Sequence, residues 1–156
     1  MDPSALAGLS EEEKQAFEEA TDVVMAYRQT ITDLYSGART RINDLDKYAT
    51  GDKLERERSN VSKGLAEGYS SEPSGVRLVL VSAEPVDLEL DSETPTVTVR
   101  ACVDASGEIR VHPDGTRVSG VREQLDYLVV KTDYLSGSGW AVAQTSGKVD
   151  PEDRQC

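Results

Sequence analysis

The chain of 156 residues has little of what catalytic and metal-binding sites commonly require, since it contains one histidine and two cysteines. These residues do not supply the ligand set of a typical zinc site. The chain lacks a Gly-x-Ser-x-Gly motif and a Gly-Lys-Ser/Thr phosphate loop, the signatures of serine hydrolases and of P-loop proteins. No apolar run approaches the roughly 18 residues of a membrane-spanning helix, and no signal-peptide pattern is present. We therefore predict no metal, no cofactor and no direct insertion of this chain into a membrane.

Basic residues are also scarce, because 17 Lys and Arg stand against 29 Asp and Glu, which gives a net charge of −12. A surface of this sign repels the phosphate backbone of nucleic acids and the headgroups of anionic lipids. These two classes of partner are therefore excluded. The acidity is spread over both halves of the chain, and the length favours one domain.

The first half of the chain has the periodicity of helices. Ser10 and Glu13 fit a capping box at a helix start. Apolar residues then recur at steps of three and four: Phe17, Ala20, Val24, Tyr27, Ile31 and Leu34. This pattern predicts a helix that ends at Gly37 and packs one face on a sheet, preceded by a loose segment over residues 1–9.

Two further helices are predicted before the end of this half. A short one carries Ile42, Leu45, Tyr48 and Ala49 and ends at Thr50-Gly51. The next begins near Asp52 and places Leu54, Val61 and Leu65 on one face. Gly64 and Gly68 each weaken it by up to about 1 kcal/mol relative to Ala. Either these glycines admit a close neighbour or the helix frays there.

The second half alternates with period two, which is typical of half-buried antiparallel strands. Val76 to Val81 is an apolar run, and Val86, Leu88 and Leu90 continue the alternation. Val97, Val99, Ala101 and Val103 form the inward face of the next strand. A hairpin over residues 108–118 turns at Pro113-Asp114-Gly115. A long strand over 121–134 then turns at Gly137-Ser138-Gly139 into a strand that begins with Trp140.

Helices followed by antiparallel strands predict an α+β fold with the helices on one face of the sheet. We expect one domain over residues 10–156. Its helices span 10–70, its antiparallel sheet spans 76–146, and a polar tail spans 147–156.

Several residues with reactive side chains have a plain structural interpretation. His112 precedes the hairpin turn and is expected to be an exposed turn residue. Four acidic residues recur at every second position and would project from one face of a strand: Asp87, Glu89, Asp91 and Glu93. We interpret them as a solvated strand face, with a weak calcium site as the alternative. The triplet Asn60-Val61-Ser62 matches a glycosylation sequon but falls within a predicted helix. The tyrosines are interpreted as core or rim residues, with a cavity lining as the alternative: Tyr27, Tyr48, Tyr69, Tyr127 and Tyr134.

The two cysteines form the most informative pair. Cys102 lies in a predicted strand and Cys156 is the last residue printed. Two buried free thiols are one interpretation. The polar segment before Cys156 has little apolar area to hold it against a sheet, so a disulfide is the other.

The order of these features resembles the NTF2-like superfamily. The resemblance rests on the helices, Ala101-Cys102-Val103-Asp104, Asp114-Gly115, Gly139-Trp140-Ala141-Val142 and the terminal Cys156. It is strongest with small actinobacterial proteins that are secreted, lipoproteins or membrane-anchored. The resemblance implies a cone, in which a curved antiparallel sheet wraps an N-terminal helix, and a disulfide between Cys102 and Cys156. It also implies an extracytoplasmic location, with any anchor outside this chain; a cytoplasmic location is the alternative.

Two classes of function follow from this resemblance. The first is a non-catalytic extracytoplasmic module that mediates protein assembly or binds a ligand at the cell envelope. An envelope protein, or a second copy bound through the exposed sheet face, would be its partner. The second is a cavity enzyme of the isomerase, dehydratase or cyclase type. Asp104, Tyr48 and Tyr69 are then the candidates for a base and its partners, although poised carboxylates and histidines are scarce.

Overall fold

The computed structural model describes residues 6–72, 78–132, 139–148 and 150–156. Within these residues the elements are, in chain order, α1 (Glu11–Ser36), η2 (Ile42–Lys47), α2 (Gly51–Glu67), β1 (Ser70–Ser71), β2 (Val79–Glu89), β3 (Thr96–Asp104), β4 (Ile109–Val111), β5 (Arg117–Ser119), β6 (Arg122–Lys131), β7 (Trp140–Ser146) and η3 (Pro151–Arg154). Helices therefore precede antiparallel strands, and the α+β class predicted from the sequence is confirmed.

The long helix α1 begins and ends where its capping residues predict. The backbone N–H of Glu13 donates to the Ser10 hydroxyl at 3.1 Å, and the N–H of Ser10 donates to the Glu13 carboxylate at 2.9 Å. Gly37 ends the helix with a φ of 83°, a left-handed conformation that glycine adopts without steric cost. Of the predicted stripe, Phe17, Ala20, Val24, Tyr27 and Leu34 are buried, whereas Ile31 is half-buried.

The second and third helices differ from the prediction in type and in packing. The short one is a 3₁₀ helix, and it is followed by a chain segment in which the Thr50 N–H donates to the Val142 carbonyl at 3.0 Å. In α2, Val61 is buried but Leu65 is 41% exposed, contrary to the prediction. Gly64 faces α1 in its place, since an added Cβ would lie 2.7 Å from the Tyr35 hydroxyl. Gly64 thus admits a close neighbour.

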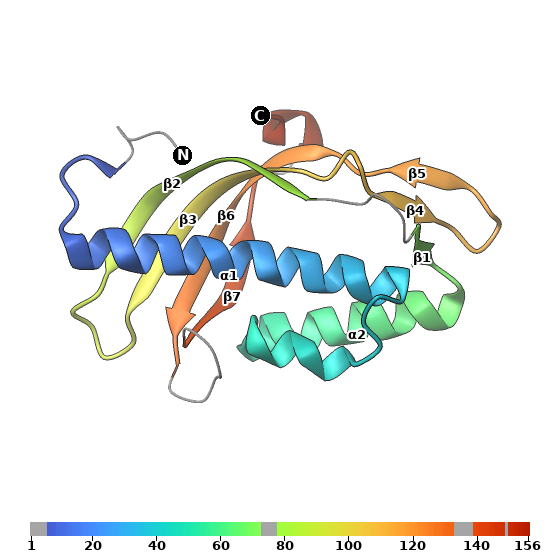
Figure 1. Cartoon of the computed structure of the whole chain (residues 1–156), viewed down its shortest axis with the longest axis horizontal. Helices are drawn as coiled ribbons and strands as arrows, with labels where there is room; N and C mark the ends of the chain where they lie inside the picture. Colours follow the sequence, from blue (N-terminus) through green and yellow to red (C-terminus); the bar gives the residue numbers. More distant parts are fainter. Residues whose placement is uncertain (1–5, 73–77, 133–138, 149) are drawn as a thin grey trace.

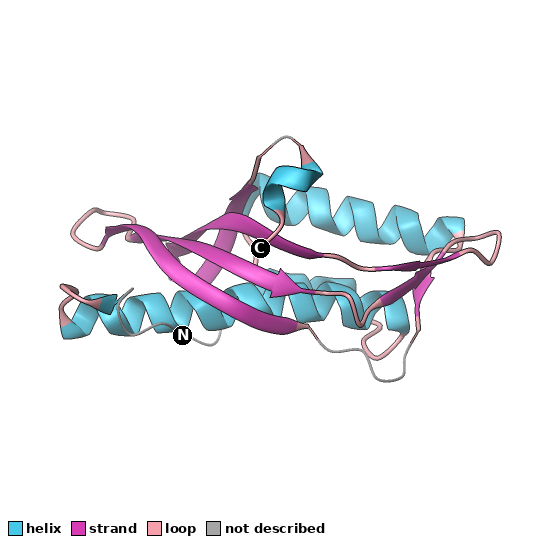
Figure 2. Cartoon of the chain, turned by 90° about the horizontal axis from the view of Figure 1, so that it is seen from above, coloured by secondary structure: helices cyan, strands magenta, loops and turns pink. Residues whose placement is uncertain are grey.

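Four strands form the main sheet, in the order β2-β3-β6-β7 with every pair antiparallel. Both helices lie on one face of this sheet, while η3 lies on the other (Figures 1 and 2). α1 contacts all four strands and α2 contacts β7. The inward residues of β3 are buried as predicted: Val97, Val99, Ala101 and Val103.

Strand β2 departs from simple alternation because it contains two bulges. Its pairing with β3 shifts register between Leu80 and Ser82 and again between Pro85 and Asp87. Val81 and Val86 therefore have no partner opposite them, and Val86 is 45% exposed rather than inward as predicted. A bulge of this kind reverses the face on which the following residues lie.

The β4–β5 hairpin does not continue the main sheet, contrary to the expectation of one sheet over residues 76–146. It pairs with β1 in a separate three-stranded sheet, at the right in Figure 1. The chain leaves the main sheet at Asp104, whose carboxylate accepts the Ser106 N–H at 2.9 Å. Gly120 passes so close to Ala105 that a Cβ would overlap the Ala105 carbonyl oxygen. The predicted hairpin turn at residues 137–138 and Tyr134 lie outside the described residues.

Candidate functional site

The space between α1 and the main sheet, where a cone enzyme would bind its substrate, is filled by side chains. α1 contributes Phe17 and Val24, η2 contributes Leu45, and the sheet contributes valines and Tyr127, all at most 1% exposed. The hollows described below lie at the surface. In the described part of the chain, the interior between α1 and the main sheet is therefore a packed core.

One partly buried polar pair joins α1 to the main sheet. The Arg28 guanidinium of α1 donates to the Tyr127 hydroxyl of β6 at 2.9 Å. Burial raises the pKa of the Tyr127 phenol, although Arg28 opposes the effect. Burial alone would lower the pKa of Arg28, but Tyr127, Glu123 and Glu108 outweigh it and raise that pKa. Both groups thus keep their protons at neutral pH, and neither is poised as a base.

A second polar cluster attaches the small sheet to α1. The buried Glu108 carboxylate accepts from the Ser71 hydroxyl at 3.1 Å and from the Arg110 guanidinium at 3.0 Å. Arg110 also lies over the Tyr35 ring, 4.0 Å from its centroid. These contacts connect β1, β4 and α1. The cluster therefore fixes the position of the β4–β5 hairpin relative to α1.

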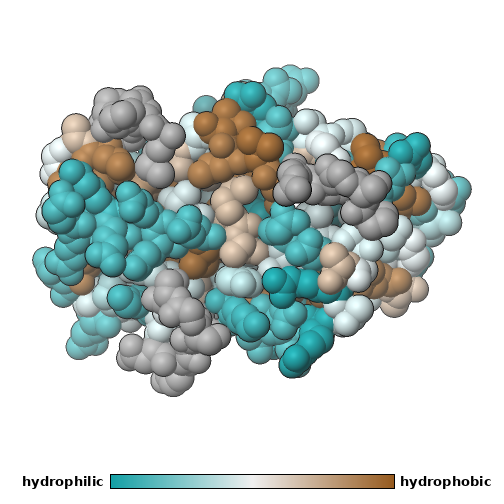
Figure 3. Space-filling model, in the orientation of Figure 1, coloured by the Kyte–Doolittle hydropathy of each residue, from teal (hydrophilic) through white to brown (hydrophobic). Residues whose placement is uncertain are grey.

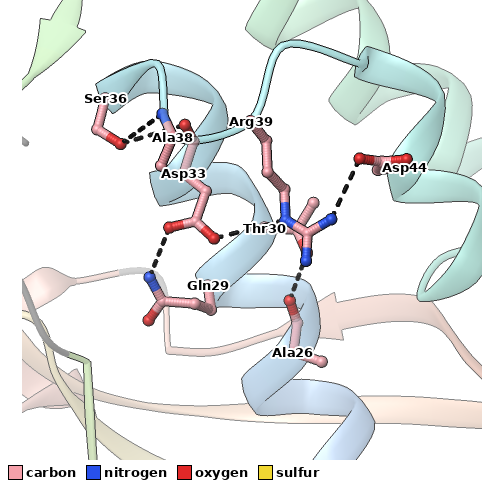
Figure 4. Close-up of polar contacts among 8 residues, drawn as sticks. All are labelled: Ala26, Gln29, Thr30, Asp33, Ser36, Ala38, Arg39 and Asp44. Carbon is pink, nitrogen blue, oxygen red and sulfur yellow. Dashed lines mark hydrogen bonds and ion pairs between the residues drawn. The ribbon is translucent and has the colours of Figure 1, made fainter.

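Figure 4 shows a third cluster, at the turn that follows α1. Arg39 pairs with Asp33 at 3.5 Å and with Asp44 at 3.1 Å, and Gln29 donates to Asp33 at 2.9 Å. Because Asp33 belongs to α1 and Asp44 to η2, the two ion pairs of Arg39 connect these helices. The cluster therefore stabilises the turn between α1 and η2.

The three residues proposed for catalysis lie at three different places. Asp104 ends β3 at the surface, where hydrogen bonds from Ser106 lower its pKa. Tyr48 directly follows η2, and its carbonyl accepts the Val142 N–H at 2.7 Å. Tyr69 follows α2 and packs on the ring of His112, with 5.0 Å between ring centroids. No hydrogen bond or ring contact among the described residues joins the three.

The acidic residues after Pro85 do not form one strand face. Asp87 and Glu89 belong to β2, whereas Asp91 and Glu93 lie in the loop that follows. Among the residues described, no group of three His, Cys, Asp or Glu side chains is arranged to hold a metal ion. Across the same residues, no helix is long and apolar enough to cross a bilayer. The sequon Asn60 is exposed within α2.

The C-terminal tail returns to the sheet and is bonded to it. A disulfide joins Cys102 and Cys156, whose Cα atoms are 6.1 Å apart, and this is the pair that the resemblance implied. Cys102 is 1% exposed although it faces away from the helices, because the tail covers it. The tail lies beside the part of β6 that extends past the end of β7, where Arg154 approaches Glu123 at 3.8 Å.

Two surface hollows flank this tail. One of about 500 Å³ lies between η3 and the start of β6, with Val121, Arg122 and Glu152 in its wall. The other, about 390 Å³, borders a charged row across the sheet. In that row Arg100 donates to Asp126 at 2.9 and 3.1 Å and lies 3.6 Å from Glu84. Both hollows carry charges of both signs, so neither selects a ligand by charge.

A third hollow region lies at the opposite end of the sheet, and sequence reasoning missed it. Two adjoining hollows of about 210 and 550 Å³ share Glu12 and Leu90, and we call them together the α1–β2 groove. Its apolar lining comprises Ala16, Leu88, Leu90, Pro95 and Trp140. Its acidic lining comprises Glu12, Glu13, Glu19, Glu89 and Asp91. The hydrophilic surface over the first half of α1 is visible at the left of Figure 3.

Comparison with known proteins shows a similar fold. The structure is similar to the intermembrane space region of the chloroplast protein ARC6, with a TM-score of 0.54 and 15% sequence identity. The match covers 83% of this chain and 94% of that chain. No protein-family model and no curated protein matches this chain. At this identity the likeness concerns the fold alone.

Proposed function

We propose that this chain is a non-catalytic, extracytoplasmic module of the NTF2-like type that mediates protein assembly. The observation that carries the proposal is the filled space between α1 and the sheet, in which Phe17, Leu45 and Tyr127 are buried. A cavity enzyme needs a concave pocket with a poised acid or base. Asp104, Tyr48 and Tyr69 meet neither condition in their observed positions.

The disulfide supports the extracytoplasmic part of the proposal. Structural disulfides persist in oxidising compartments and are rare in the reducing cytosol. The ARC6 region, whose fold is similar, is an intermembrane space region. Both observations agree with a module that works at a cell envelope.

Thiol labelling in the native host tests the location. Intact cells are treated with a membrane-impermeant phosphine and then with a maleimide polymer that shifts the protein on a gel. We expect a shift of two additions in intact cells, and no shift when the phosphine is omitted. Labelling without the phosphine, and only after lysis, would contradict the proposal.

Cross-linking in the envelope tests the assembly role. The protein is cross-linked in intact cells, purified under denaturing conditions and examined for a covalent adduct of discrete mass. We expect one dominant protein adduct that is absent when the cells are denatured before cross-linking. A purified protein that turns over a small molecule, with no adduct, would favour the enzyme class instead.

A further inference from the structure

The α1–β2 groove combines an apolar floor with an acidic rim. Its floor includes the half-buried Leu88 and Leu90, and Trp140 is 2% exposed at its inner end. Five carboxylates line it, whereas Lys131 is the one base among its lining residues. A ligand that fits this groove therefore carries positive charge together with apolar side chains.

Two of the rim carboxylates are held in place by the fold. Glu19 accepts from the Trp140 indole N–H at 2.9 Å, and Glu13 accepts the Ser10 N–H in the capping box. In the described part of the chain, no ion pair neutralises Glu12, Glu89 or Asp91. The rim thus presents charges that a ligand can neutralise, beside charges whose positions are already set.

The arrangement of these charges limits what the ligand can be. The carboxylates are spread along the groove, and no three of them are arranged around a metal position. A second copy of the chain is disfavoured, because each copy carries a net charge of −12. Nucleic acid and anionic lipid are excluded by the same repulsion. A basic segment of a different protein satisfies both the charge and the apolar floor.

We propose that the α1–β2 groove binds a basic, partly apolar peptide segment of a partner protein. The apolar side chains of this segment lie on Leu88 and Leu90, and its lysines or arginines pair with Glu12, Glu89 and Asp91. The proposal rests on the function proposed above, an assembly module, and assigns that function to one surface.

Peptide binding to the purified, oxidised protein tests the groove directly. The probe is a fluorescein-labelled decapeptide of alternating lysine and leucine, and the comparison peptides alternate lysine with serine and glutamate with leucine. We expect saturable binding of the first peptide alone in 150 mM salt. The triple variant Glu12→Gln, Glu89→Gln, Asp91→Asn should weaken this binding about tenfold, because it removes three charge pairs with the peptide.

A matched control separates local pairing from general attraction. The triple variant Asp52→Asn, Glu55→Gln, Glu67→Gln removes the same charge from α2 and should change the affinity less than threefold. Leu90→Ser should reduce the affinity for the lysine–leucine peptide to that for the lysine–serine peptide. Equal losses in the two triple variants, or no saturable binding, would overturn the groove proposal.

Photo-cross-linking in the host separates this proposal from the function on which it rests. Benzoylphenylalanine is placed at Ser92 in the groove, at Ser62 on α2 and at Gln124 on the outer sheet face. A protein adduct at Ser92, mapped to a lysine- or arginine-rich segment of the partner, supports the groove. Adducts at Ser62 or Gln124 without one at Ser92 overturn the groove and leave the assembly role standing. No adduct at any site overturns both.

Discussion

Replacing Cys156 by alanine removes the covalent tie between the tail and β3, and the structure gives a magnitude for the loss. The bonded cysteines are 54 residues apart in the sequence. Because the bond lowers the entropy of the unfolded chain, the loop-entropy treatment gives a stabilisation of the folded state of about 4 kcal/mol. The total free energy of unfolding of such a domain is about 5–15 kcal/mol. The variant Cys156→Ala should therefore lose a large share of the stability.

Alanine at position 156 is the suitable change because it leaves Cys102 as a small, buried, largely apolar side chain. Urea unfolding followed by circular dichroism measures both the midpoint and the slope of the transition. We expect a lower midpoint and a steeper slope in the variant, since an unfolded chain without the bond exposes more surface. Wild-type protein in reductant should unfold like the variant.

The neighbouring residue supplies the control for this experiment. Gln155→Ala alters the exposed tail next to the bond and keeps the disulfide, so its midpoint should remain within the usual range of a surface substitution, about 0.5 kcal/mol. An unchanged midpoint in Cys156→Ala would refute the reasoning. A loss that Gln155→Ala reproduces would assign the effect to contacts of the tail and not to the covalent bond.

Three further predictions concern the core. Phe17→Ala should cost about 3–5 kcal/mol, and Ile31→Ala should cost clearly less because Ile31 is half-buried; equal midpoint shifts in urea would contradict this ranking. Tyr127→Phe should cost about 1–3 kcal/mol, because the half-buried Arg28 guanidinium loses its acceptor. A midpoint equal to that of the wild type would show that the pair does not contribute to stability. Burial raises the pKa of the Tyr27 and Tyr127 phenols above the ordinary 10.0, so the folded state retains these protons and the free energy of unfolding falls as the pH rises above that value. Absorbance at 295 nm during an alkaline titration should show tyrosines that ionise only on unfolding, and complete ionisation of every tyrosine in the folded protein would contradict this.

Local patterns were sufficient to predict α1 and β3. The start of α1 depends on Ser10 and Glu13, which are three residues apart, and its end depends on Gly37 alone. The inward face of β3 depends on alternation within nine residues. Both signals are contained within the element that they describe, so the sequence carries them without reference to the rest of the fold.

The departures in β2 and in the hairpin depend on contacts between distant residues. Val81 and Val86 become unpaired only through the register that β2 adopts against β3, and alternation within β2 does not reveal it. The hairpin leaves the main sheet because Gly120 passes beside Ala105 and because Glu108 joins Ser71 and Arg110. The secondary-structure propensity of a residue describes its local preference, so it cannot predict any of these contacts between distant residues.

The candidate site was missed for the same reason. Glu12 falls between the capping residues Ser10 and Glu13 of the predicted helix start, and the spacing of Asp91 predicts a solvated strand face. Glu12 does lie in the first turn of α1, and Asp91 is exposed as expected, although it lies in the loop after β2 and not in the strand. Only the packing of α1 beside the end of β2 brings the two carboxylates to one groove over the same leucines.

The features that complicate β2 also bear on how a partner can bind. β2 is at the edge of the main sheet, and an exposed edge strand commonly recruits another strand through its free backbone groups. Here two bulges interrupt the edge, Pro85 lacks an N–H, and Glu84 and Asp87 place charges beside it. These devices oppose strand addition along β2 even though Val79 is 53% exposed. A partner that approaches this side of the described chain therefore has to bind through side chains, and the α1–β2 groove at the end of the same strand offers both the apolar floor and the charges to do so.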